Sequence, residues 1–413
     1  MRSAAMGLAA LALSAPLAVQ GAYGIFTHGQ GIESQGMGGI AFTSISETYV
    51  AFSNPALLQR VGDRLDIGLD YIWVSGTAGL DNNAAGPDDR FKANRVRHYP
   101  IPQIGYSKRL SPAITVGMSA FSAGLGTDFT RSPYERFGAE RRGSLGLVQS
   151  GIAFAGAYEP VAGQLIGFSI NPAYQVLELK GLQVFGAASE NPDRFSDTGH
   201  GEAYGVSFTW AWHGELTPWL NAALSYRTRT FTERIKRYSG LLPDQGRLQT
   251  PAVWGGGLSF TPHADWTVAV EAQRVEYASE VGYGNSIARL EAGAQFGADD
   301  GPGFGWRDQN IYKVGVAWQA TPALRLMAGG SHATRLIPGD EMFLNMLAPG
   351  TLRMHYTAGV RYAFERWQVT GYSAYSPTQF QLGVDSVPDA FGGGDASART
   401  KMHMFGISFG RQF

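Results

Sequence analysis

The sequence contains no cysteine and little charge, and both shortages narrow the class of protein. Without a thiol there is neither a disulfide framework nor a thiolate metal site. Asp, Glu, Lys and Arg make up 16% of the 413 residues, against about 25% in a typical soluble domain. The formal net charge of −1 leaves no basic footprint for nucleic acid, so we expect no such partner.

Long hydrophobic runs are missing as well. No run of about 18 apolar residues follows the first twenty positions, which excludes a bundle of membrane-spanning helices. Disorder is excluded because 12% of the residues are aromatic. Glycine is abundant instead, with 55 residues, nearly double the usual share of about 7%. Such a chain can face lipid without looking hydrophobic.

The sequence also gives no clear motif for a catalytic or cofactor-binding site. No H-E-x-x-H pair or P-loop occurs, and the eight histidines are scattered singly along the chain. Serine and histidine are both present, but their spacing identifies no nucleophile and base. We therefore expect no enzyme activity, no cofactor and no metal.

Residues 1–21 have the features of a secretory signal peptide. Arg2 supplies a minimal positive region, an apolar stretch runs from Leu8 to Val19, and small residues follow. We expect cleavage just before Ala22 or Tyr23. The alternative is a short hydrophobic helix that is retained, although the stretch is too short to span a bilayer. The sequence thus predicts an exported protein.

From about residue 64 the hydrophobic pattern has a period of two. In residues 65–73 one parity is Leu, Ile, Leu, Tyr and Trp, while the other carries Asp, Gly and Asp. Residues 204–212, 266–270, 312–318 and 356–364 repeat this alternation. An apolar outer face with a small or polar inner face is typical of a barrel wall in lipid.

The connections between these segments alternate in length. Six short turns are expected at Ser111-Pro112, Glu159-Pro160, Thr217-Pro218, Thr261-Pro262, Thr321-Pro322 and Glu365-Arg366. Seven long loops are expected near residues 76–99, 126–145, 180–201, 234–250, 279–305, 336–350 and 378–400. Thirteen connections predict fourteen strands. Short periplasmic turns opposite long extracellular loops indicate an all-β, 14-stranded antiparallel transmembrane barrel of the outer membrane.

The last predicted strand supports export to that membrane. Residues 405–413 alternate and the chain stops on Phe413, which resembles the signal read by the outer-membrane insertion machinery. We expect that machinery to be a partner during biogenesis, and the mature protein to be a monomer among outer-membrane lipid and lipopolysaccharide.

The segment before the barrel is different. Residues 29–39 hold too many glycines for a helix interior, at about 1 kcal/mol each relative to alanine. Two interpretations remain: an N-terminal hatch (plug) folded into the lumen, or a periplasmic extension. The predicted domains are therefore a signal peptide over 1–21, a hatch over 22–63 and a barrel over 64–413.

Four short motifs resemble a known family. They are Asn54-Pro55-Ala56 after Gly36-Met37-Gly38-Gly39, then Gly124 to Phe129, Trp306-Arg307-Asp308, and the terminal Phe413. In their order along the chain they resemble the FadL family of outer-membrane transporters for hydrophobic compounds and long-chain fatty acids, which includes toluene transporters. The tripeptide resembles part of the family's hatch.

The resemblance implies a mechanism. Members are fourteen-stranded barrels closed by a hatch, and an inward kink in the third strand opens the wall sideways. Cargo is captured at the extracellular loops, passes into the lumen and leaves laterally into the membrane. Here the kink would comprise Phe121, Ser122, Ala123, Gly124, Leu125 and Gly126, with Asn54, Pro55 and Ala56 packed against it. The alternative is that Gly124 and Gly126 merely begin a loop.

Strand parity places eight charged or titratable side chains in the lumen: Asp66, Asp70, Arg227, Glu271, Lys313, Arg325, His355 and Arg361. One interpretation is that they pair with each other and hold the hatch to the wall. The other is that Lys313, Arg325 or Arg361 receives a fatty-acid carboxylate. In the loop after the third strand, Tyr134 and Phe137 are candidates for an apolar capture groove, or else are aromatics at the bilayer interface.

The function expected from these features is passive uptake of hydrophobic compounds, either long-chain fatty acids or aromatic hydrocarbons, across the outer membrane of a Gram-negative bacterium. The alternative is a general diffusion porin for small polar solutes. A porin would lack the hatch and carry a charged constriction loop.

Overall fold

The computed structural model describes residues 21–93 and 95–413. Fourteen long strands close into one antiparallel barrel, as the turn count predicted. They are β1 (Arg64–Asp81), β3 (His98–Ser111), β4 (Ile114–Phe129), β5 (Gly143–Val161), β6 (Gln164–Lys180), β7 (Gly201–Thr217), β8 (Leu220–Arg227), β10 (Val253–His263), β11 (Trp266–Val275), β12 (Gln309–Gln319), β13 (Leu324–Ala333), β14 (Met354–Phe364), β15 (Trp367–Gly383) and β16 (Asp395–Gln412). The predicted signal peptide lies outside the described residues, apart from Gly21.

Each strand pairs with its neighbours in the chain, and the first strand pairs with the last. The β1–β16 ladder runs without a break from Arg64↔Gln412 to Asp81↔Asp395, so the first and last strands close the sheet into a barrel. Two short strands are added to these fourteen: β2 (Asp89–Ala93) pairs antiparallel with the end of β1, and β9 (Phe231–Thr232) pairs with β7.

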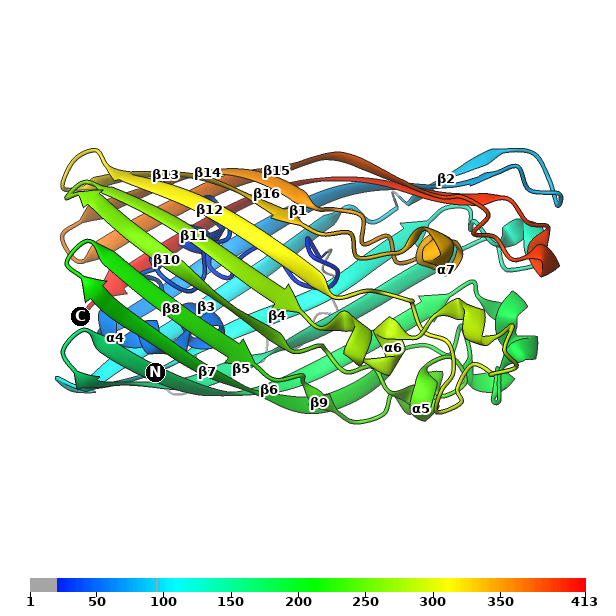
Figure 1. The fold of residues 1–413 in the computed structure, drawn as a ribbon, viewed down its shortest axis with the longest axis horizontal. Helices are drawn as coiled ribbons and strands as arrows, with labels where there is room; N and C mark the ends of the chain where they lie inside the picture. The colour runs from blue at the N-terminus through cyan, green and yellow to red at the C-terminus, as the bar shows by residue number, and fades with distance from the viewer. Residues whose placement is uncertain (1–20, 94) are drawn as a thin grey trace.

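All short turns lie at one end of the barrel and all long loops at the other (Figure 1), and the C-terminus lies at the end with the short turns. Two of the six predicted turns are displaced. The turns expected at Glu159-Pro160 and Thr261-Pro262 lie at residues 162–163 and 264–265. The prolines sit where the strand register shifts, at β-bulges, because proline cannot donate a ladder hydrogen bond.

The long loops after β1, β4, β6 and β15 begin later than predicted because these strands extend beyond the expected belt; β1, for example, continues to Asp81. The loops after β8, β11 and β13 begin earlier than predicted. The long loops contain short helical turns: η2 (Glu135–Phe137), η3 (Gln183–Ala188), η4 (Pro192–Arg194), η5 (Lys236–Tyr238), α5 (Pro243–Gly246), η6 (Tyr277–Ser279), α6 (Val281–Gly284), η7 (Ile287–Arg289), η8 (Gly339–Glu341), α7 (Met342–Asn345) and η9 (Asp389–Phe391). None of the described helices is both long and apolar enough to cross a bilayer.

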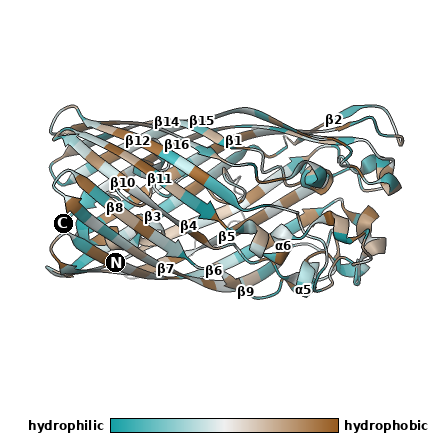
Figure 2. Cartoon of the chain, viewed as in Figure 1, coloured by the Kyte–Doolittle hydropathy of each residue, from teal (hydrophilic) through white to brown (hydrophobic). Residues whose placement is uncertain are grey.

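The two faces of the wall differ as the alternation predicted. Apolar side chains such as Ile67, Leu69 and Phe409 are about half exposed on the outside, whereas Asp66 and Asp70 on the other parity are buried. Figure 2 shows apolar and polar residues alternating along the strands. This apolar outer face of the wall is a surface that lipid can cover.

Residues 21–63, the N-terminal segment, lie inside the barrel toward the end with the short turns (Figure 1), and nearly all of them are buried. The segment contains α2 (Ile32–Gly36), α3 (Val50–Ser53), η1 (Pro55–Leu57) and α4 (Leu58–Val61). It packs on strands from opposite sides of the barrel, including β4 to β7 and β13 to β16. Glycines allow this close packing; a Cβ at Gly329 would lie 2.7 Å from the Gly38 Cα.

Candidate functional site

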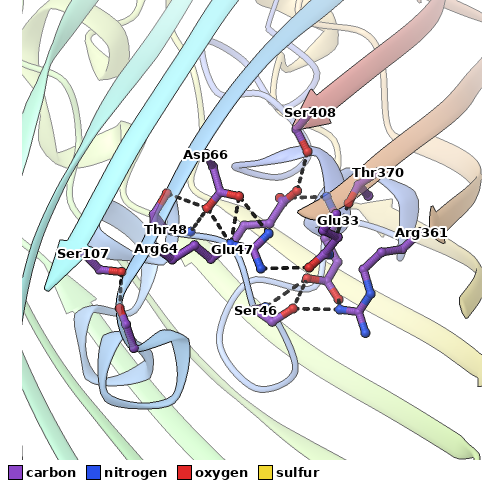
Figure 3. A network of polar contacts seen from close by, with 12 residues as sticks. Glu33, Ser46, Glu47, Thr48, Arg64, Asp66, Ser107, Arg361, Thr370 and Ser408 are labelled. Atoms are coloured by element: carbon purple, nitrogen blue, oxygen red, sulfur yellow. Dashed lines mark hydrogen bonds and ion pairs between the residues drawn. The ribbon is translucent and has the colours of Figure 1, made fainter. Parts of the chain in front are cut away.

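A network of charged side chains joins the N-terminal segment to the wall (Figure 3). The buried Glu33 carboxylate accepts hydrogen bonds from Ser46 N and Oγ at 2.9 and 2.7 Å, and from Arg361 Nη1 at 3.0 Å. Arg325 Nη1 lies 3.9 Å from the same carboxylate. One acid of the segment is therefore shared by two cations of β13 and β14.

The same network continues to β1 and β16. Asp66 accepts hydrogen bonds from Thr48 N and Oγ1, both at 2.8 Å, and pairs with Arg64, whose Nη2 lies 2.7 Å away. Glu47 accepts one from Ser408 Oγ at 2.8 Å. Since these groups are buried, losing one partner would leave another charge unpaired, which is costly.

On the opposite wall, β11 and β12 bind backbone groups of the segment. Both carboxylate oxygens of Glu271 are used, accepting from Ala41 N at 2.9 Å and Phe42 N at 2.7 Å. Lys313 Nζ donates to Gly39 O at 2.8 Å and to Gln273 Oε1 at 3.0 Å. The wall thus satisfies backbone groups that a glycine-rich segment without long helices cannot satisfy itself.

These contacts bear on three candidate cations. Lys313, Arg325 and Arg361 are candidates to receive the carboxylate of a cargo molecule, and all three contact the N-terminal segment. The contacts favour the interpretation in which lumen charges hold this segment to the wall. Parity located these side chains in the lumen, but it could not identify their partners.

Glu47 gives the network a pH dependence. Burial raises the pKa of Glu47 to about 8, and the nearby Asp66 and Glu33 carboxylates add to the rise. An acid whose pKa is raised by folding stabilises the fold fully below its ordinary pKa of 4.5, and this contribution is lost as the pH rises toward 8. We expect Glu47 to lower thermal stability in detergent as the pH rises from 5 to 8, and Glu47→Gln to make the slope of stability against pH less negative by removing that contribution. The exposed Glu233→Gln is the control; equal slopes for wild type and Glu47→Gln would contradict the assignment.

The wall is incomplete between β3 and β4. Their ladder runs from Ser111↔Ile114 only as far as Gly105↔Ser119, although β4 continues to Phe129. Within the described chain, residues 120–129 of β4 have no partner on β3, while their pairing with β5 continues without a register shift. Residues 123–129 are buried on both parities, so this end of β4 bends into the barrel. Gly124 N donates to Ile25 O of the N-terminal segment at 2.7 Å.

The N-terminal segment meets this bend through Phe52. Its ring stacks on that of Phe121, with centroids 4.1 Å apart and planes 8° from parallel. Phe121 is one of the residues expected at the kink, but nothing in the sequence singled out Phe52. Its identification as the contact depends on the fold.

The Asn54-Pro55-Ala56 motif was expected to pack on the bend. It packs instead on β5, β6 and β7. Asn54 caps η1, its Oδ1 accepting from Ala56 N at 3.1 Å, and its Nδ2 donates to Phe42 O at 2.7 Å. Ala56 packs against Leu165 and Ala211, because the side-chain-free Gly167 lets the η1 backbone approach β6. The motif therefore fixes the segment to the wall beside the bend.

An apolar cavity lies on the loop side of the bend. Its volume is about 10 Å³, and its lining is entirely apolar. Leu125 at the bend contributes to it, together with Leu145, Leu147, Leu177, Leu179, Leu241, Leu242, Leu248, Tyr283, Phe304 and Trp306. Leu145 and Leu147 occupy the lumen parity of β5, which is small or polar in most other strands. Apolar residues at lumen-facing positions, close to the loop end of a strand, are thus a sequence signal for this cavity.

A second cavity, of about 50 Å³, has a mixed lining. Phe26, Phe52, Gln273 and Lys313 contribute to it, together with Arg227. The Arg227 guanidinium carbon lies 4.2 Å from the Phe52 ring centroid and 5.1 Å from that of Phe26. No carboxylate among residues 21–93 and 95–413 lies within 4 Å of Arg227, unlike Arg325 and Arg361. Arg227 is therefore a cation still open to a ligand.

The loop aromatics form a packed cluster above these cavities. Tyr134 is fully buried, and its hydroxyl donates to Phe343 O at 2.6 Å. Burial raises the pKa of Tyr134 well above its ordinary value. Phe137 packs edge-on against Phe343 and Phe391, with centroids 5.7 and 5.5 Å apart. Tyr134 is therefore not an exposed interface aromatic, and whether the cluster captures cargo remains a prediction.

The described residues give little support for a metal site or for a catalytic serine. In the part of the chain that is described, no three His, Asp or Glu side chains converge where a metal ion could bind. Residues 406–410 have the G-x-S-x-G spacing, but Ser408 lies within β16 and donates to Glu47. A nucleophile of that motif would sit on a strand-to-helix turn.

A closed 14-stranded barrel with an apolar exterior and a chain segment in its lumen is the architecture of an outer-membrane channel. No family model matches the chain, and no curated protein matches its sequence. Solved structures do match. The toluene transporter TodX of P. putida superposes with a TM-score of 0.71 at 16% identity, over 94% of this chain and 99% of that one.

Two further structures agree. The toluene transporter TbuX of Ralstonia pickettii gives a TM-score of 0.66 at 16% identity, over 94% of this chain and 99% of its own. A FadL homologue of Pseudomonas aeruginosa gives 0.67 at 13% identity, over 93% and 98%. The chain therefore has the fold of FadL-type channels, as the motif resemblance implied.

Proposed function

We propose that this protein takes up hydrophobic compounds passively across the outer membrane of a Gram-negative bacterium. The observation that carries the proposal is the inward bend of β4, where the wall lacks its ladder with β3 and Leu125 borders an apolar cavity. The solved structures with this fold include toluene transporters and a FadL homologue, which supports the same function.

The path follows from the order of these features. The loop cluster around Tyr134 and Phe137 captures the compound. The leucine-lined cavity, which at about 10 Å³ has room for no more than one water molecule, widens to admit the compound before it leaves sideways between β3 and β4. Each methylene that passes from water into hydrocarbon gains about 0.8 kcal/mol, so no energy source is needed. Residues 22–63 act as the hatch that closes the lumen to water, which disfavours the general porin.

Uptake assays test this function. In a bacterial strain lacking its own channels for these compounds, the protein is expected to accelerate uptake of radiolabelled oleate or toluene, but not of a small sugar. Equal acceleration of the sugar would favour the porin. No acceleration of either hydrophobic compound, with the protein correctly folded in the outer membrane, would refute the proposal.

Arg227 provides a test of cargo type. If the cargo is a fatty acid, Arg227 is the cation left to receive its carboxylate, and a hydrogen bond to a charged group contributes roughly 1.5–3 kcal/mol. We expect Arg227→Met to lower the rate of oleate uptake at limiting concentration about tenfold or more, and to leave toluene uptake unchanged.

The loop variant Arg335→Met is the matched control for Arg227→Met. A parallel fall in oleate and toluene uptake would mean that the substitution disturbs Phe26 and Phe52 and not a carboxylate site. Unchanged uptake of both compounds would favour a neutral hydrocarbon as the natural cargo.

A further inference from the structure

The outer face of β1, β3, β15 and β16 shows where the apolar belt ends on the loop side. Along β1 the outward side chains are apolar up to Trp73, and Ser75 and Thr77 follow. In the register row of Trp73 lie His98 of β3, His403 of β16 and, one strand further, Tyr375 of β15. His403 contacts the rings of Tyr375 and Trp73, with centroids 4.7 and 5.3 Å apart. Such a belt of amphipathic rings marks a membrane–water interface.

Three cations lie directly above that belt. Lys401 is opposite Ser75, and Arg399 and Lys92 flank Thr77 on its two sides, all on the same outward parity as Trp73. Arg399 and Lys92 are two strand spacings apart, about 10 Å, and Arg399 and Lys401 are two residues apart, about 7 Å. We call these three residues the cation row.

The cation row is not neutralised by the protein. Among the described residues no carboxylate lies within 4 Å of any of the three, whereas the neighbouring Arg90 pairs with Asp81 at 2.6 Å. The ammonium of Lys401 instead lies 5.3 Å from the Trp73 ring centroid, and the guanidinium carbon of Arg399 lies 5.5 Å from that of Phe380. Lys92 and Arg399 are exposed.

A second observation concerns β15, which borders the cation row. Phe380 shares a register row with Arg399, and Leu382 lies in the next row. Phe380, Leu382 and Val384 are 53%, 40% and 64% exposed, although they stand above the belt where water would be expected. Cations beside exposed apolar groups fit a ligand that carries both negative charge and hydrocarbon.

We propose that this face is a binding site for lipopolysaccharide. The phosphates of its sugar head lie on Lys92, Arg399 and Lys401, and its acyl chains lie along Phe380 and the belt below. Lipopolysaccharide carries both negative charge and hydrocarbon at this depth, because its phosphorylated sugars sit just outside the hydrocarbon of the outer leaflet. The inference rests on the outer-membrane location in the proposed function, but not on transport.

Binding in detergent tests the site without transport. Purified wild-type protein and the Lys92→Gln/Arg399→Gln/Lys401→Gln variant are titrated with diphosphorylated lipid A and followed by native mass spectrometry. Since one cation near an anionic lipid surface contributes on the order of a tenfold change in affinity or slightly less, we expect the variant to lose at least about tenfold. The phosphate-free form of lipid A is expected to bind both proteins equally weakly.

The matched control is Lys236→Gln/Arg335→Gln/Arg366→Gln, which removes the same charge from exposed positions elsewhere. It should bind lipid A as wild type does. Equal affinity of the cation-row variant and wild type, or an equal loss in the control, would overturn the site. Competition by inorganic phosphate at millimolar concentration would also overturn it, by showing a simple anion site. Correct folding of each variant is checked by heat-modifiable gel migration.

Discussion

Replacing Gly124 with arginine is expected to lower the uptake of a hydrophobic compound by about tenfold or more, with the barrel still assembled. Gly124 lies on the inward end of β4 next to Leu125, where the cargo is proposed to pass between the apolar cavity and the gap beside β3. A charged side chain there makes the passage polar, and burying it without a partner costs several kcal/mol. Uptake of radiolabelled toluene or oleate measures the effect.

Ala292→Arg is the control for this substitution. Ala292 is exposed in the long loop between β11 and β12. It should leave uptake close to the wild-type rate. Unchanged uptake in correctly folded Gly124→Arg protein would sink the lateral exit.

Removing residues 22–62 is expected to convert a barrel that conducts almost no ions into an open pore. The N-terminal segment fills the lumen at the end with the short turns, and Glu33, Glu47 and their wall partners hold it there. Without it, those wall charges would line a water-filled channel. Single-channel recordings in planar bilayers would show the difference, and a large conductance of the intact protein would favour the general porin.

A point substitution tests the same closure in the full chain. A Cβ at Gly167 would overlap Ala56 N and lie 2.5 Å from Pro55 C, and these backbone atoms cannot yield without moving η1. Gly167→Leu is therefore expected to dislodge η1 and raise conductance part of the way. At Gly146, another strand glycine, the nearest atom to a Cβ is 3.9 Å away, so Gly146→Leu should conduct as wild type does.

Much of the barrel could be predicted from the sequence. Period-two alternation determines which side chains face lipid, so the amino-acid pattern alone assigns Asp66, Arg227 and Glu271 to the lumen. The alternation of short and long connections predicts the strand number because turn residues are local signals. The positions predicted for two turns were wrong because they relied on proline. A bulge within a strand and a turn both tolerate a residue without an N–H.

The partners of the lumen groups could not be predicted in the same way. Arg361 and Arg227 have the same parity pattern, yet one binds Glu33 and the other stacks on Phe52. The difference depends on how residues 21–63 fold, and a glycine-rich segment has no periodicity from which to predict its path. The contact between Phe52 and Phe121 was missed for this reason.

The connections between the two ends of the chain have a consequence for the order of folding. Glu33 is held by Arg361, 328 residues away, and Glu47 by Ser408, 361 residues away. β1 likewise pairs with β16 along its whole length. Contacts so distant in sequence form only after a large loss of chain entropy, so they form late. The first part of the protein to be made therefore waits for the last strands before it can be enclosed, and any chain truncated before β14 would leave Glu33 without Arg361 and Glu47 without Ser408.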